Sequence, residues 1–207
     1  MKRLATVISV SIAFSLSLPQ TVGAQAAIVP VDFTPFADGL NWIVKQPLVY
    51  RVGVSRDSVV VPVGFVTDFA SIPPALQSVI QQNGPYQLPA LVHDYLYWEQ
   101  ACTRSQADRI LLLAMTEHHV KNGDKTAIYD AVRAAGKFAW DGNAKERAQH
   151  LPRILPEDHL HIPALTTWRA YRAELLRDGV VDAPSEPIAH SFCARGSITI
   201  KKALETP

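Results

Sequence analysis

The segment LPALVHDYLYWE, residues 88–99, has apolar side chains on every face and also carries a histidine and an aspartate near its middle. A helix that is apolar all round lies in the core of a protein. In such a helix His93 and Tyr97, four residues apart, share one face, and Asp94 points about 100° away from His93. The segment therefore predicts a buried helix that carries three polar side chains into the interior.

A second helix is predicted to begin near Ser105, because Ser105 and Asp108 have the spacing of a capping box, with Asp in place of the usual Glu or Gln. Its expected end is Asn122-Gly123, a common signal for the end of a helix. If this helix returns antiparallel to the first, Asp108 comes back to the imidazole of His93.

A third helix is predicted after Asp124, which can cap its first turn. Ile128, Val132, Ala135 and Phe138 recur at helical spacing, so we expect them to form one apolar stripe against the core.

Three short runs of β-branched and aromatic residues precede these helices, at residues 42–44, 48–52 and 58–61. Polar turns separate them, and Pro62 ends the third run because proline cannot donate a ladder hydrogen bond. The runs predict a small antiparallel meander.

The chain beyond Trp140 is polar and interrupted by prolines, with one amphipathic helix expected over residues 166–178 and stopped by Gly179. The expected fold class is therefore α+β: a short antiparallel β-meander, then a small helical bundle, then an irregular, partly helical C-terminal tail.

The first residues have the pattern of a secretory signal peptide. Lys2 and Arg3 precede an apolar run over residues 4–18, and cleavage after Ala24 or Ala26 would place small residues at the required positions. Serines interrupt the run and no stop-transfer flank follows, which makes a retained membrane anchor the weaker interpretation. We expect an exported protein, periplasmic or secreted, with no transmembrane segment in the mature chain.

These patterns divide the chain into three parts: a signal peptide at 1–26, an α+β core domain at 27–140, and a C-terminal extension at 141–207 that packs on the core. The mature protein of about 180 residues is long enough for one domain with a real core.

Charge and cysteine content narrow the function. The chain has 20 basic and 19 acidic residues and a net charge of +1, so no electrostatic argument favours nucleic acid as a partner. Cys102 and Cys193 are its two cysteines, and in an oxidising compartment we expect them to form one disulfide.

Three motifs follow one another in the chain: VPVGFVTDFASIP at 61–73, HDYLY at 93–97, and ADRI with AM at 107–110 and 114–115. In this order they resemble a bacterial and phage family catalogued as domain of unknown function 1353. The resemblance covers about residues 42–140 and implies a small α+β domain that is often found in phage-derived genes. It does not supply an activity.

A more distant likeness is to the centre of secreted and viral phospholipases A2, carried by His93-Asp94-x-x-Tyr97 and the later Asp108. That likeness implies that His93 is the general base and that Asp94 binds calcium. It also implies that Asp108 orients the histidine and that Tyr97 supports the hydrogen bonds around it.

Each of these residues also has an ordinary structural interpretation. His93 can be a core histidine satisfied by a carbonyl group, and Asp94 can form a salt bridge with Arg104 or Arg109. Asp108 can cap its own helix, where a carboxylate favours the N-terminal turn.

Asp68 follows a predicted strand and offers a second carboxylate to the same centre, although a turn or cap interaction is the ordinary role of such a residue. With Asp94 it could hold a divalent cation, and Ca²⁺ is the candidate.

Two functions follow from these residues. One is an exported hydrolase, metal-assisted through Asp94 and Asp68, which acts on phospholipid esters or cell-wall linkages. The other is a non-catalytic, phage-derived module that binds a protein of the cell envelope and buries its His-Asp network as scaffold. A catalytic centre must open to a pocket, whereas scaffold residues can be sealed, so the depth of the centre distinguishes the two.

Overall fold

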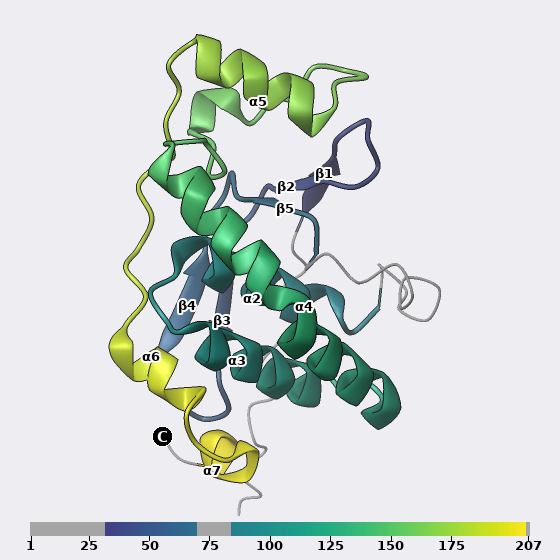
Figure 1. Ribbon diagram of the computed structural model, residues 1–207, viewed down its shortest axis with the longest axis vertical. Coiled ribbons are helices and arrows are strands. Elements are labelled where there is room, and N and C mark those ends of the chain that lie inside the picture. Colours follow the sequence, from purple (N-terminus) through teal and green to yellow (C-terminus); the bar gives the residue numbers. More distant parts are fainter. Residues whose placement is uncertain (1–31, 70–83, 206–207) are drawn as a thin grey trace, which may run out of the picture.

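The computed structural model describes residues 32–69 and 84–205. The expected signal peptide therefore lies outside the described residues. Residues 71–79, where the cap residue Ser71 and the prolines that follow it predict a short helix, also lie outside them. Within the described part, short antiparallel strands precede the helices, which confirms the α+β class (Figure 1). No helix in that part combines the length and the hydropathy needed to cross a bilayer.

The strands belong to two small sheets. The predicted strands are all present, but β2 does not pair with β3. Val44 instead exchanges backbone hydrogen bonds with Gly64 and Phe65, so the segment leading into β5 occupies the edge of β2. One sheet has the order β1-β2-β5 and the other is the β3-β4 hairpin. Their bounds are β1 Phe33–Pro35, β2 Trp42–Val44, β3 Leu48–Arg51, β4 Ser58–Val61 and β5 Val66–Thr67.

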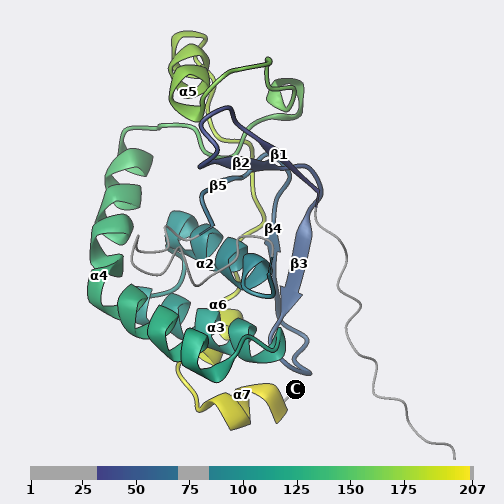
Figure 2. The same ribbon diagram turned by 90° about the vertical axis from the view of Figure 1, so that its right-hand side faces the viewer.

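Helix α2, Gln87–Glu99, is the centre of the domain, as its apolar composition predicts. It contacts α3, α4, β4 and β5, and Figure 2 shows it between α4 on one side and the β3-β4 hairpin on the other. Pro89 lies in its first turn, where a missing N–H breaks no hydrogen bond. Gln100 caps the end of the helix: it donates its N–H to the carbonyl of Leu96, and its left-handed backbone turns the chain out of the helix.

Helix α3, Arg104–Glu117, has its N-cap two residues before the predicted cap. The capping box is formed by Thr103 and Gln106, whose side chains each accept a hydrogen bond from the other's backbone N–H. The predicted cap at Ser105 and Asp108 is therefore wrong: Thr103 has the extended backbone that a cap requires, and a glutamine stands three residues later. Asp108 lies in the second turn and faces α2.

Helix α4, Asn122–Ala148, begins where the sequence predicts the end of α3. Ile128 and Val132 are buried as predicted, but Ala135 is exposed and the side chain of Phe138 is 89% exposed. The predicted stripe is wrong there: in this part of α4, which runs along one side of the molecule in Figure 2, it is Gly136 and Trp140 that lie against Tyr97 of α2. It also runs through the expected domain boundary at 140/141.

The C-terminal segment contributes to the core along its whole length. Ile154 pairs with Phe65 in an antiparallel bridge, and Phe192 and Ala203 are fully buried in the main cluster. The predicted amphipathic helix is α5, at one end of the molecule, from which an extended stretch leads to two short helices at the other end (Figure 1). The segment contains a 3-10 turn at Glu157–His159, α5 at Trp168–Arg177, α6 at His190–Arg195 and α7 at Ile200–Glu205.

The predicted cysteine pairing is confirmed. Cys102, just before α3, is bonded to Cys193 in α6, with the two Cα atoms 5.2 Å apart. The disulfide ties the last part of the chain to the start of the helix that carries Asp108.

We expect the disulfide to contribute about 4 kcal/mol to the free energy of unfolding, because it closes a long loop in the unfolded chain. The cysteines are 91 residues apart. Denaturant unfolding of the oxidised protein and of a Cys102→Ser/Cys193→Ser variant measures the difference. In reducing buffer the two proteins should become nearly equal, and equal stability in oxidising buffer would contradict the expectation.

Candidate functional site

The histidine of α2 and the aspartate of α3 meet. His93 Nε2 lies 3.2 Å from Asp108 Oδ1, within hydrogen-bond distance. His93 is 3% exposed and Asp108 is completely buried. The geometry predicted from their spacing is therefore confirmed, although Asp108 reaches His93 without serving as a cap.

The carboxylate of Asp108 accepts hydrogen bonds from three side chains. Tyr97, on the same face of α2 as His93, donates its hydroxyl to Oδ1. Arg104, one turn before Asp108 on α3, donates Nη1 to Oδ2 at 3.2 Å. Arg104 therefore pairs with Asp108, not with Asp94. These donors hold the carboxylate in one orientation.

Burial keeps His93 neutral. Loss of solvation lowers its pKa below the ordinary value, and this outweighs the hydrogen bond and the negative charge of Asp108, which act in the opposite direction. The contact with Asp108 is therefore a hydrogen bond donated by Nε2 and not an ion pair. In this tautomer Nδ1 keeps its lone pair, and it has no hydrogen-bond partner in the described part of the chain.

Asp94 lies on a second face of α2, beside β5. Its Oδ2 accepts a hydrogen bond of 2.5 Å from the hydroxyl of Thr67, and Thr67 in turn accepts from the backbone N–H of Phe69. Tyr86 is buried close by, and burial raises the pKa of its hydroxyl, as do the charges of Asp94 and Asp68. The motif around Thr67 and the motif around His93 thus meet at one place.

A cavity of about 570 Å³ opens beside this centre. Its polar wall includes Asp68, His93, Asp94 and Tyr97. The opposite wall is a face of α4, to which Asn143 and Glu146 contribute polar groups. Its other lining residues are small or apolar: Ala131, Val132, Ala135, Gly136, Phe138, Ala139 and Gly142. Ligand sites commonly combine a largely apolar lining with a few convergent polar groups.

The cavity also contains a cation that sequence reasoning missed. Arg153 lies in the loop after α4, where its Nε donates to the carbonyl of Val66 and its Nη1 to Asn143. Its guanidinium group lies over the rings of Phe65 and Trp98, 5.8 and 5.6 Å from their centres. No sequence motif surrounds Arg153, so only its position in the fold identifies it.

The predicted metal ligands lie in the same cavity but do not form a complete side-chain cage. Asp94 and Asp68 both line it. Among the described residues, however, no three His, Cys, Asp or Glu side chains are grouped closely enough to hold a metal ion. Calcium takes six to eight oxygen ligands, so two carboxylates do not suffice by themselves. Calcium binding at Asp94 and Asp68 therefore stays a prediction.

Comparison with known proteins finds a family model that matches one segment of the chain. Residues 42–132 match the model described as Protein of unknown function (DUF1353), the family that the sequence motifs resemble. The match covers less than half of the 207-residue chain. It extends from β2 into α4 and so contains the site residues predicted from the sequence, whereas Arg153 lies beyond it. No curated protein and no solved structure matches the chain, and the likeness to phospholipases A2 rests on the motif alone.

Gly136 allows α4 to lie close to the hydroxyl of Tyr97: a Cβ atom at this position would be 2.5 Å from that oxygen. We expect Gly136→Ala to displace Tyr97 from Asp108 and to lower the free energy of unfolding by about 1–3 kcal/mol, the usual cost of overpacking. The gain in helix propensity, about 1 kcal/mol, offsets only part of this cost.

The control for this variant is Gly142→Ala, on the same helix with nothing within 4 Å of the added Cβ. It should raise the stability by up to about 1 kcal/mol. Denaturant unfolding compares the two variants, and equal stabilities would show that the contact with Tyr97 does not constrain α4.

The lowered pKa of His93 makes stability depend on pH. Below the ordinary pKa of 6.5 the unfolded chain takes up a proton that the folded protein does not bind. The contribution of His93 is therefore full above about pH 6.5 and is lost as the pH falls toward its lowered pKa. We expect the free energy of unfolding to fall more between pH 7 and pH 5.5 in the wild type than in His93→Gln. Parallel curves for the two proteins would contradict this.

Proposed function

We propose that this protein is an exported hydrolase in which His93 acts as the general base. The observation that carries the proposal is the state of the imidazole. His93 is neutral, its Nε2 is held by Asp108, and its side chain lines a cavity. Its Nδ1 is a buried atom without a hydrogen-bond partner among the described residues, so a water molecule that enters from the cavity would satisfy it. A base needs a free lone pair, a fixed tautomer and access to the reactant.

In the proposed reaction a water molecule in the cavity gives a proton to Nδ1 of His93, and its oxygen attacks the carbonyl carbon of an ester or amide. The resulting oxyanion collapses, and the bond to the leaving group breaks. The leaving oxygen or nitrogen then takes the proton back from Nδ1. No group on the protein is consumed, and His93 returns to its neutral form.

The surrounding residues have separate tasks in this reaction. Asp108 accepts a hydrogen bond from the Nε2–H of His93 and stabilises the imidazolium that forms when Nδ1 is protonated. Tyr97 and Arg104 hold the carboxylate of Asp108 in its orientation through their hydrogen bonds. Arg153 supplies a fixed positive charge in the cavity for the oxyanion, because preorganised charge in a site of low polarity stabilises a developing negative charge.

The residues that line the cavity favour lipid esters over cell-wall linkages as substrates. The wall formed by α4 consists largely of small and apolar residues, which suit an acyl chain better than a sugar or a charged peptide. Both substrate classes are accessible to an exported protein, so both belong in the test.

The alternative function is a phage-derived module that binds a protein of the cell envelope. The complete burial of Asp108 and the saturation of its carboxylate by three donors favour this alternative, because buried scaffold networks have the same features. Against it, His93, Asp94 and Tyr97 line a cavity.

The test is hydrolysis of phospholipid vesicles and of cell-wall sacculi by the purified protein and its variants. We expect His93→Gln to lower kcat by about 10²–10⁴-fold, because that is the contribution of a general base. Asp108→Asn should lower kcat by a smaller factor and also lower the stability. His118→Gln, at the end of α3 and outside the cavity, is the matched control and should keep full activity.

Each outcome decides something. If the wild type hydrolyses neither substrate, or if His93→Gln keeps its activity, the proposal of a hydrolase is wrong. Absence of hydrolysis of both substrates, together with a large fall in the melting temperature of every variant, favours the envelope-binding module. Activity that a chelator removes and Ca²⁺ restores supports the calcium prediction for Asp94 and Asp68, whereas full activity with chelator contradicts that prediction and leaves the hydrolase standing.

A further inference from the structure

A second pocket, of about 420 Å³, lies away from the His93 cavity, where the first turns of α3 meet α4 and the turn after α6. The two cavities share no lining residue. The proposed hydrolase does not use this pocket, so its role is a separate question.

The charge of this pocket is entirely positive. Arg109 of α3 and Arg133 of α4 both line it, and no Asp or Glu is among its described lining residues. Neither guanidinium group forms an ion pair with a described carboxylate, in contrast to the neighbouring Arg104, which is paired with Asp108. Two like charges that share one concave surface repel each other, and a bound anion removes that cost.

The remaining polar groups of the pocket are hydrogen-bond donors or can become donors. Gln106 donates its side-chain amide to the hydroxyl oxygen of Ser197 at 3.0 Å, which leaves the proton of that hydroxyl available to a ligand. Ser105, whose oxygen lies 3.3 Å from that of Thr103, adds a second hydroxyl. Guanidinium groups and hydroxyls together suit a group with several terminal oxygens.

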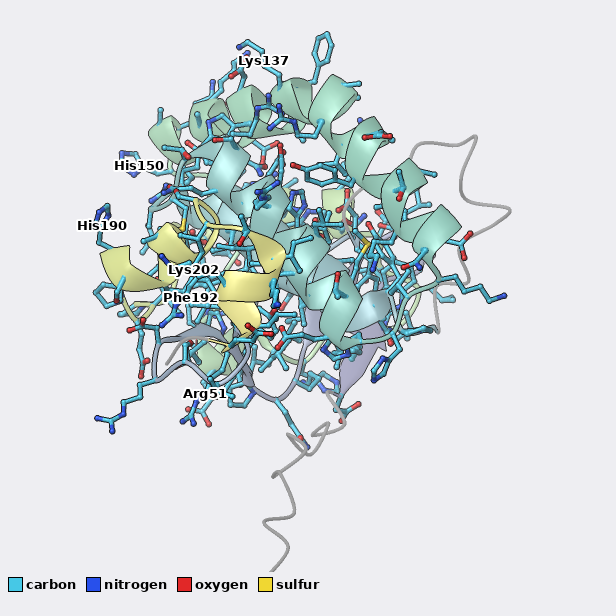
Figure 3. The ribbon with its side chains drawn as sticks, turned by 90° about the horizontal axis from the view of Figure 1, so that it is seen from below. Arg51, Lys137, His150, His190, Phe192 and Lys202 are labelled. Carbon is cyan, nitrogen blue, oxygen red and sulfur yellow. A yellow bond between two sulfur atoms is a disulfide. The ribbon has the colours of Figure 1, made fainter. Side chains whose placement is uncertain are left out.

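The wall that carries Ser197 is held in place covalently and by close packing. The disulfide between Cys102 and Cys193 ties α6 to the start of α3. Cys193 lies only four residues before Ser197, so the bond also holds the turn that carries Ser197. Gly196 lies so close to α3 that a Cβ atom there would be 2.5 Å from the carbonyl oxygen of Gln106. Figure 3 shows α6 and α7 together against the rest of the molecule, with His190 pointing outward.

We propose that this pocket binds the phosphate group of a phosphate monoester, with Arg109 and Arg133 as its charged ligands. Arginine matches the oxygens of phosphate with two parallel N–H donors, and two arginines match its double negative charge. The volume exceeds that of one phosphate group, and the side chain of Tyr129 on the rim offers a surface for the organic part of the ester. Phosphate binding in this pocket does not depend on the proposed hydrolase activity, because no group of the His93 centre takes part in it.

The experiment is isothermal titration of the full oxidised protein with inorganic phosphate and with glycerol 3-phosphate at fixed ionic strength. We expect both to bind, and Arg109→Gln and Arg133→Gln each to weaken binding by about 10-fold, the loss of one charge-assisted contact. Arg177→Gln, an exposed arginine at the end of α5, is the matched control and should bind as the wild type does. His93→Gln should also bind normally, which separates this site from the hydrolase.

Two further arms identify the source of the phosphate. Cosedimentation with vesicles of phosphatidic acid in phosphatidylcholine, lost in the arginine variants, assigns the site to a lipid headgroup. Binding of glycerol 3-phosphate without vesicle binding assigns it to a soluble ester. Absence of phosphate binding, equal binding by the arginine variants, or acetate binding as tightly as phosphate would each overturn the proposal.

Discussion

A buried negative charge organises the centre of this protein. Asp108 is completely enclosed between α2 and α3, and leaving such a carboxylate without partners would cost several kcal/mol. His93, Tyr97 and Arg104 all donate to it, two of them from α2 and one from α3. The relative position of the two helices is therefore set by hydrogen-bond geometry as well as by apolar contact, because a small displacement of either helix would break these bonds.

The polar centre lies on a helix that is otherwise apolar. Nearly every residue of α2 is buried, so the helix needs neighbours all round, and α3, α4 and the strands supply them. The α4 side of this helix is different, because most of the α4 residues that line the cavity beside His93 and Asp94 are small or apolar. A well-packed core and a histidine that lines a cavity therefore lie on the same helix.

Sequence reasoning was most successful where a local pattern has one geometric consequence. The four-residue spacing of His93 and Tyr97 and the short connection to the next helix suffice to predict the contact with Asp108. A chain with two cysteines suffices to predict their pairing. Sequence reasoning failed where two patterns compete. Thr103 with Gln106 and Ser105 with Asp108 both have the spacing of a capping box. The extended backbone of Thr103 shows that the first pair forms it. Asn122-Gly123 likewise fits the end of one helix or the start of another.

The sequence by itself determined the α+β class, the buried helix with its histidine, the partner aspartate and the disulfide. These follow from periodicity, spacing and counting, which are properties of neighbouring residues. Only the tertiary structure decided that Arg153 enters the His93 cavity and that Arg109 and Arg133 share a pocket without a carboxylate. Arg153 comes from a loop 60 residues after His93 in the sequence, and Ser197 comes from a turn 88 residues after Arg109. Contacts between such distant residues depend on how whole elements pack, and no local pattern records them.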